Sequence, residues 1–260
     1  MGEVYSHSKL WLFENCPEAY KIKYIDRSMP KLPSSIHAFL GSMVHDSLEW
    51  LYGQVMLNKT PECDELIRKF AENWQDNFEM DLRIPTGENV QEFFNKGIKF
   101  LIRYYNSNFP FHEDTIHLEK RIIFPISEDV KIMGFVDRIV KKGFNEYEVH
   151  DYKTNSKMKS QEEVDKDRQL AFYHLGLQEL FGEDINVSLI WHFLAHDKKI
   201  VSSRTQDELN KLKFDTLNLI ETIKFEKEWK ACGKKWCDWC SHKRSMKFFN
   251  KGNHDLRGFF

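Results

Sequence analysis

The chain has 260 residues, enough to bury a sizeable core as one domain. Hydrophobic residues make up 41% of it and aromatic residues 14%, which excludes the composition of a disordered chain. No apolar run approaches about 18 residues and the first residues lack the apolar core of a signal peptide, so a cytoplasmic, intracellular protein without membrane contact is expected. The net charge of −2 neither favours nor excludes nucleic acid, because lysines can gather on one face.

The N-terminal part is predicted to be mostly helical. Ser6 or Ser8 can cap a short helix in residues 5–13, and Pro17 ends it and starts a second turn. Apolar residues then recur at helical spacing and predict three amphipathic helices. These cover residues 38–57, 62–80 and 88–106. Their aromatic stripes are expected to form core and not a platform for stacking bases.

Three strands are predicted next, in residues 115–126, 132–140 and 147–152. The last two carry the carboxylates Asp137 and Asp151. Asp151 and Lys153 are two apart and project from one face, and antiparallel pairing can bring Asp137 beside them. Two acids and a lysine suit a hard cation such as Mg²⁺, with the ammonium facing the attacking water or the phosphoryl oxygens. The alternative is a surface hairpin with solvated charges.

The remaining elements complete an α/β pattern. Residues 161–180 are predicted as a helix on which Gln169 and Tyr173, four apart, share a face. Residues 186–195 form an almost uninterrupted apolar strand, and the helical crossover before it implies parallel pairing with the strand of Asp151. A long charged helix follows in residues 206–230. No Walker motif is visible, so any helicase motor must come from another chain.

The five cysteines are an odd number in a chain expected to meet reducing conditions, so a disulfide framework is not expected. Cys237 and Cys240 have the C-x-x-C spacing of a metal site, and Cys232 adds a thiolate nearby. Cys16 is the fourth candidate ligand, whereas Cys63 is expected to be an ordinary, partly buried thiol. Thiolate clusters select zinc or iron–sulfur.

Taken together, the motifs resemble the PD-(D/E)XK nuclease superfamily, in particular its RecB-like branch. The strand motif G-x-V-D (Gly134–Asp137) is followed by D-Y-K-T (Asp151–Thr154). GSMVH (Gly41–His45) lies upstream and QLAFY (Gln169–Tyr173) downstream, in that branch's order. The opening string S-x-S-K-L-x-x-F-x-x-C-P-x-x-Y is similar to the first motif of RecB/AddB nuclease domains and of CRISPR-associated four-cysteine exonucleases. The resemblance runs from Ser6 to about Lys243.

The resemblance implies a restriction-endonuclease-like core, a mixed sheet in the order α-β-β-β-α-β, with added N-terminal helices and a C-terminal cysteine-containing lobe. We expect one nuclease domain over residues 1–260. Its parts would be a mostly helical segment (1–110), the catalytic sheet core (111–205), and a C-terminal helix with the cysteine lobe (206–260).

The resemblance also implies roles for individual residues. Asp137, Asp151, the backbone carbonyl of Tyr152 and His45 would hold one or two Mg²⁺ or Mn²⁺ ions, although a lone helical histidine is more often a core or surface residue. Asp137, Asp151 and Lys153 would be catalytic. Gln169 and Tyr173 would position DNA, since an amide and a phenol can both hydrogen-bond phosphate or base edges. Glu119 ranks below these, because its strand equally suits an exposed edge.

For the cysteines, the resemblance implies that Cys16, Cys232, Cys237 and Cys240 hold a [4Fe–4S] cluster. Zinc, with the same thiolates and His242 as a further ligand, is the alternative, and free thiols are the third. In the family the isolated downstream cysteine usually follows the C-x-x-C pair, whereas Cys232 precedes it.

The sequence therefore predicts a metal-dependent DNA nuclease, expected to be an exonuclease. It would act on DNA with a single-stranded end in end processing, recombination, repair or CRISPR adaptation, together with a helicase or a recombination or CRISPR protein. The competing hypothesis is a catalytically silent nuclease-fold module that binds DNA ends or a partner and carries a structural iron–sulfur or zinc site.

Overall fold

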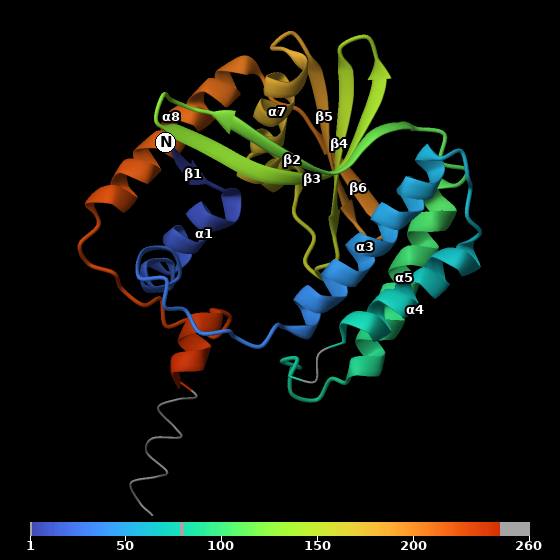
Figure 1. The fold of residues 1–260 in the computed structure, drawn as a ribbon, viewed down its shortest axis with the longest axis horizontal. Helices are drawn as coiled ribbons and strands as arrows, with labels where there is room; N and C mark the ends of the chain where they lie inside the picture. Colours follow the sequence, from blue (N-terminus) through green and yellow to red (C-terminus); the bar gives the residue numbers. More distant parts are fainter. Residues whose placement is uncertain (1, 79–80, 245–260) are drawn as a thin grey trace, which may run out of the picture. The chain divides into compact units, whose positions relative to one another are not determined.

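The structure is a computed structural model that describes residues 2–78 and 81–244 (Figure 1). It divides into two compact units. The sheet unit comprises the chain up to Val4 together with Pro33–Lys213. The cysteine unit comprises Tyr5–Leu32 and the chain from Phe214 onward.

The described residues form one mixed sheet of six strands (Figure 1). Its strands are β1 (Glu3–Tyr5), β2 (Asp114–Pro125), β3 (Val130–Gly143), β4 (Glu146–Lys153), β5 (Asn186–Phe193) and β6 (Lys198–Ser202). The order is β1-β3-β4-β5-β6, and β2 also pairs with β3. The pairs β2–β3, β3–β4 and β5–β6 are antiparallel, whereas β4 and β5 are parallel. The predicted meander and the parallel fourth strand are confirmed, whereas β1 and β6 were not foreseen.

Two helices, not one, connect β4 to β5. They are α6 (Gln161–Asp165) and α7 (Arg168–Phe181). The single helix predicted for residues 161–180 is wrong because Asp167 interrupts it: its carboxylate accepts a hydrogen bond from the Leu170 amide at 3.1 Å and caps α7. The crossover leaves β5 parallel to β4, as a long helical connection requires. Helix α7 packs against β2, β3 and β5.

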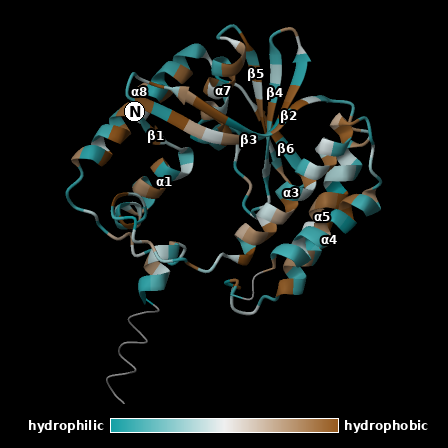
Figure 2. Ribbon diagram, in the orientation of Figure 1, coloured by the Kyte–Doolittle hydropathy of each residue, from teal (hydrophilic) through white to brown (hydrophobic). Residues whose placement is uncertain are grey.

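A three-helix layer completes the sheet unit. It contains α3 (Ile36–Met56), α4 (Cys63–Asn77) and α5 (Val90–Asn108). Polar and apolar stretches alternate along these helices, as amphipathic packing requires (Figure 2). Phe70, Trp74 and Phe93 are buried between them, so the prediction that these aromatic residues form core is confirmed. Helix α4 ends at Asn77, and Met80, the predicted end, lies outside the described residues.

The cysteine unit joins two segments that are far apart in sequence. The first contains α1 (His7–Asn15), α2 (Pro17–Tyr20) and the π-helix η1 (Lys21–Ile25). The second begins within α8 (Gln206–Phe225), which ends five residues before the predicted position. The Glu18 carboxylate joins the segments by accepting hydrogen bonds from Trp239 Nε1 at 2.7 Å and from Lys243 Nζ at 2.6 Å.

Within the described residues, no helix combines the length and the apolar character needed to cross a bilayer.

Candidate active site and thiolate cluster

Asp137 lies where β3, β4 and α3 approach one another. Its Oδ2 accepts a hydrogen bond from the Tyr152 backbone N–H at 2.8 Å and lies 3.3 Å from Nδ1 of His45. Nε2 of the same imidazole lies 2.8 Å from the Tyr152 carbonyl oxygen. One ring therefore bridges the carboxylate and the carbonyl that the sequence proposed as metal ligands.

The pKa of His45 indicates that this position favours a positive charge. Burial disfavours an imidazolium, but the hydrogen bond and charge of Asp137, with the charge of Asp151, outweigh it and raise the pKa of His45 to about 9. Without a metal the ring is protonated at neutral pH, and each nitrogen can donate a hydrogen bond. The surrounding oxygens thus stabilise a cation at this point.

Glu119 stands directly opposite Asp137. Leu118 pairs with Arg138 and Lys120 with Val136, which leaves Glu119 facing Asp137 across the β2–β3 pair. Its φ of 43° lies in the left-handed region that non-glycine residues rarely adopt, and such strain clusters at functional sites. Ligand atoms of His45, Glu119 and Asp137 all lie within 4.8 Å of one another. Burial, with the Asp137 charge, raises the pKa of Glu119 to about 7.

Asp151 belongs to a closed ring of four side chains. The Lys153 ammonium forms an ion pair with its Oδ2 and donates to Oε1 of Gln169 at 3.2 Å. Nε2 of Gln169 donates to Oη of Tyr173 at 2.7 Å, and that hydroxyl lies 3.4 Å from Asp151 Oδ1. The Tyr173 ring packs over Gly134, where a Cβ would meet Cε1 of the ring at an ordinary contact distance of 3.4 Å. The strand and helix motifs predicted from sequence therefore contact each other.

Burial raises the pKa of Asp151, and the Lys153 ammonium limits this rise. For Lys153, burial disfavours the charged form, but the Asp151 carboxylate outweighs it and raises the pKa of the ammonium. The pair is therefore held in its charged form, with the ammonium fixed beside the acid cluster.

The donor set suits a hard divalent cation. Carboxylates of Asp137 and Glu119, the Tyr152 carbonyl and the His45 imidazole supply three oxygens and one nitrogen, as Mg²⁺ and Mn²⁺ accept. Asp151 is not in the group whose ligand atoms lie within 4.8 Å, because its carboxylate faces Lys153 and Tyr173. The structure thus gathers most of the predicted ligands and adds Glu119.

Arg138, missed by the sequence interpretation, supports Tyr152 from the opposite face of the sheet. Its fully buried guanidinium donates to Tyr152 Oη at 2.9 Å and to Glu113 Oε2 at 2.7 Å, and lies 3.9 Å from the centre of the Tyr52 ring. Side chains alternate along a strand, so Arg138 points away from the site while its neighbour Asp137 points into it. An arginine inside the apolar run FVDRIV was the available signal.

The cysteine unit brings its four thiols together. Sγ of Cys240 lies 3.8 Å from that of Cys16 and 3.7 Å from that of Cys232, and all four sulfurs, including Cys237, lie within 4.8 Å of one another. Tetrahedral Zn–S bonds of about 2.3 Å would place sulfurs about 3.8 Å apart. The thiolates therefore fit a metal. Cys63 is a partly buried free thiol in the sheet unit, as predicted.

Comparison with known proteins extends these observations to nearly the whole chain. Residues 4–245 match the family model of the PD-(D/E)XK nuclease superfamily. The crystal structure of a putative exonuclease from Eubacterium rectale has a TM-score of 0.51 with 12% sequence identity, covering 91% of this chain and 86% of that chain. At that identity the likeness shows the fold alone. Comparison with curated proteins gave no significant match. With nearly its full length matched to the family and the expected mixed sheet observed, the chain belongs to the PD-(D/E)XK nuclease superfamily.

Proposed function

We propose that this protein is a metal-dependent DNA nuclease of the RecB-like branch that hydrolyses phosphodiester bonds. The observation that carries the proposal is the group of His45, Glu119 and Asp137, whose ligand atoms lie within 4.8 Å of one another, with the ion pair of Asp151 and Lys153 beside it. The partly buried oxygens around the His45 imidazole support a divalent cation as the occupant of this position.

Each residue has a definable part in the chemistry. Asp137, Glu119, His45 and the Tyr152 carbonyl would hold Mg²⁺ or Mn²⁺, with Asp151 close by. When bound, the ion would polarise the scissile phosphate and lower the pKa of a bound water. Lys153 orients that water or donates to a phosphate oxygen. Gln169 and Tyr173 hold Lys153 and Asp151 in place and offer hydrogen-bond donors to the DNA backbone.

Replacement of Lys153 tests the catalytic assignment. Lys153→Met keeps the apolar stem and removes the charge, so cleavage should fall by about 10²–10⁴-fold. Lys166→Met is the matched control, because Lys166 forms only an exposed ion pair with Glu162 and its loss should change the rate less than about twofold. The assay is cleavage of end-labelled single-stranded DNA in Mn²⁺, Mg²⁺ or EDTA. Undiminished cleavage by Lys153→Met would contradict the assignment of Lys153 as a catalytic residue.

Linear and circular substrates separate the modes of action. We expect loss of linear DNA alone, which identifies an exonuclease, whereas cleavage of circles identifies an endonuclease. A wild-type protein that binds DNA ends and cuts neither substrate with either ion would support the catalytically silent module instead.

We infer that the four cysteines hold a structural metal. Their sulfur spacing supports a single tetrahedral ion such as zinc, while the resemblance to four-cysteine nucleases supports a [4Fe–4S] cluster. Metal analysis of the purified protein decides, because zinc would be present at one atom per chain and a cluster at four irons with acid-labile sulfide.

The biological setting proposed is processing of DNA ends in recombination, repair or CRISPR adaptation, with a helicase or a recombination or CRISPR protein as partner. In this setting the sheet unit and the cysteine unit act as one nuclease domain.

A further inference from the structure

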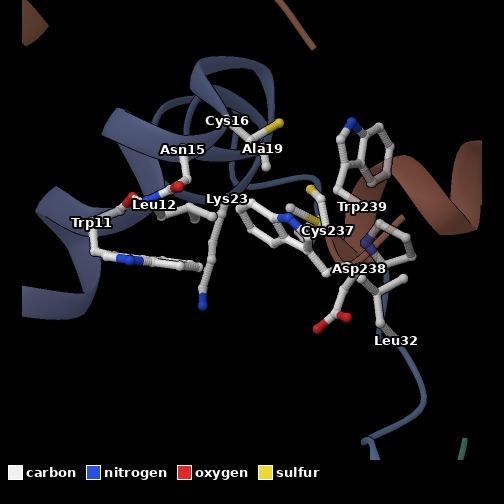
Figure 3. Close-up of a pocket in the computed structure, with 13 residues that line it drawn as sticks. Trp11, Leu12, Asn15, Cys16, Ala19, Lys23, Leu32, Cys237, Asp238 and Trp239 are labelled. Atoms are coloured by element: carbon white, nitrogen blue, oxygen red, sulfur yellow. Dashed lines mark hydrogen bonds between the residues drawn. The ribbon is translucent and has the colours of Figure 1, made fainter. Parts of the chain in front are cut away.

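The cysteine unit contains a cavity of about 420 Å³ beside the thiolates (Figure 3). Both segments of the unit line it, and the lining includes Cys16 and Cys237 together with Leu12 and Ala19. This volume lies in the range of sites that bind small molecules or single groups of a larger ligand.

Tryptophans form much of the cavity wall. The ring centroids of Trp11 and Trp236 are 5.7 Å apart with the planes tilted by 44°, so the two indoles support each other. They nevertheless remain 44% and 52% exposed, which is more than their contribution to a core would explain. Trp239, by contrast, is fixed by its hydrogen bond to Glu18. Two large aromatic faces are therefore available to a ligand.

The segments that line the cavity are rich in basic residues, and the lining itself contains one lysine and one aspartate, Lys23 and Asp238. Residues 11–32 and 230–244, which contain the whole lining, carry nine lysine and arginine residues against four aspartate and glutamate residues, whereas the entire chain has a net charge of −2. Lys23 lines the cavity and extends beside Trp11 (Figure 3). Nζ of Lys234 lies 5.0 Å from the centre of the Trp236 ring. Indole faces flanked by ammonium groups match a base flanked by phosphates.

We propose that this cavity binds an unpaired base of single-stranded DNA. The base contacts the indole faces of both Trp11 and Trp236, and the phosphates on either side pair with Lys23 and Lys234. Asp238, the acidic residue of the lining, can accept a hydrogen bond from an N–H group of a base, such as N3–H of thymine, and disfavours a bare phosphate in its place. A base inside a duplex is stacked on its neighbours and is not accessible to an indole face, so the site selects single strands. The inference rests on the proposed function in taking DNA as the substrate.

The test removes the base and the indole in turn. Binding is measured by fluorescence anisotropy without added divalent ions, in full-length protein carrying Lys153→Met, with a 12-nucleotide oligodeoxythymidylate and an abasic strand of equal length. Trp11→Ala and Trp236→Ala should each weaken binding of the thymidylate by about 5- to 100-fold and of the abasic strand by less than about twofold. Phe225→Ala is the control, because Phe225 is 78% exposed in the same unit and does not line the cavity. It should change neither affinity.

Lys23→Gln tests the second half of the proposal. It should weaken both ligands alike and reduce the slope of log Kd against log salt, because its partner is the phosphate and not the base. Metal content and circular dichroism equal to those of the parent protein verify that each variant is folded.

Three outcomes would overturn the proposal, and a fourth would separate it from the nuclease function. Equal losses for both ligands in the tryptophan variants would give the indoles a structural role. If the tryptophan variants keep both affinities but change the sedimentation coefficient, the cavity would instead be a contact between protein molecules. If the wild type cleaves DNA but Trp236→Ala binds the thymidylate as tightly as its parent does, the base site would be wrong and the nuclease function would stand. If binding depends on the base but the wild type cleaves nothing, the proposed nuclease function would be wrong and the base site would be supported.

Discussion

His174 is buried on α7, and neither ring nitrogen has a hydrogen-bond partner among the described groups. Burial, with the nearby charge of Arg204, lowers the pKa of His174 to about 4. The folded protein therefore binds fewer protons here than the unfolded chain, whose histidine pKa is about 6.5. Its contribution to stability is complete above pH 6.5 and is lost as the pH falls toward 4, by roughly 3 kcal/mol in total.

His174→Leu should remove that part of the acid sensitivity. Between pH 8 and pH 5 the wild type should lose about 2 kcal/mol more of its free energy of unfolding than the variant loses. Urea titrations at the two pH values measure this difference, with His112→Leu, at an exposed position, as the control. His150 and His192, whose pKa values burial also lowers, contribute equally to both proteins and cancel. Identical losses in wild type and His174→Leu would contradict the assignment.

At the same scale, the sequence predicted those site residues whose placement follows from local periodicity. Asp151 and Lys153 share a strand face, and Gln169 and Tyr173 share a helix face, so their meeting needed only the right pairing of two elements. The position of Glu119 beside Asp137 and His45 could not be predicted, because it depends on an unusual backbone torsion that the residue type does not indicate. The contacts of Arg138 involve partners from several segments, which periodicity does not reveal.

Among the elements, α5 contains a glycine that packing requires. A Cβ on Gly97 would lie 2.3 Å from Cζ of the fully buried Phe70 of α4 and 3.0 Å from Cδ1 of Leu40 of α3. Gly97→Ala should therefore lower the free energy of unfolding by about 1–3 kcal/mol despite the better helix propensity of alanine.

Gly53 of α3 provides the matched comparison, because a Cβ there would meet only Cδ1 of Leu118 at 3.9 Å. Gly53→Ala should raise the free energy of unfolding by about 0.5–1 kcal/mol. Both values follow from urea unfolding monitored by circular dichroism. A stabilised Gly97→Ala variant would show that the three-helix layer repacks more easily than the structure indicates.

Element boundaries were the weaker part of the sequence prediction. The break between α6 and α7 depends on Asp167 acting as a cap, which competes with its capacity to sit inside a helix. Strand β6 has the sequence KKIVS, a short and lysine-rich segment at the edge of the sheet, where the hydrophobic alternation that marks a strand is weakest.

On the scale of the whole molecule, the cysteine unit should depend on its metal. Cys16→Ser removes one of four clustered thiolates and should lower metal affinity at least about 10-fold, with a lower melting temperature because metal binding adds to folding energy. Cys63→Ser, in the sheet unit, should leave the metal content unchanged. Elemental analysis and thermal melts with and without a chelator measure both effects. Full metal occupancy in Cys16→Ser would exclude Cys16 as a ligand.

The two-segment construction of the cysteine unit also sets an order of events during synthesis. Cys16 precedes Cys240 by 224 residues, on the order of 10–45 seconds of translation at roughly 5–20 residues per second. The segment that forms most of the sheet unit, Pro33–Lys213, is synthesised in that interval. It can fold before Cys232, Cys237 and Cys240 are translated. A nascent chain halted before Cys232 already has every proposed catalytic residue but only one of the four thiolates. Metal loading therefore distinguishes chains that have been translated through Cys240 from those that have not.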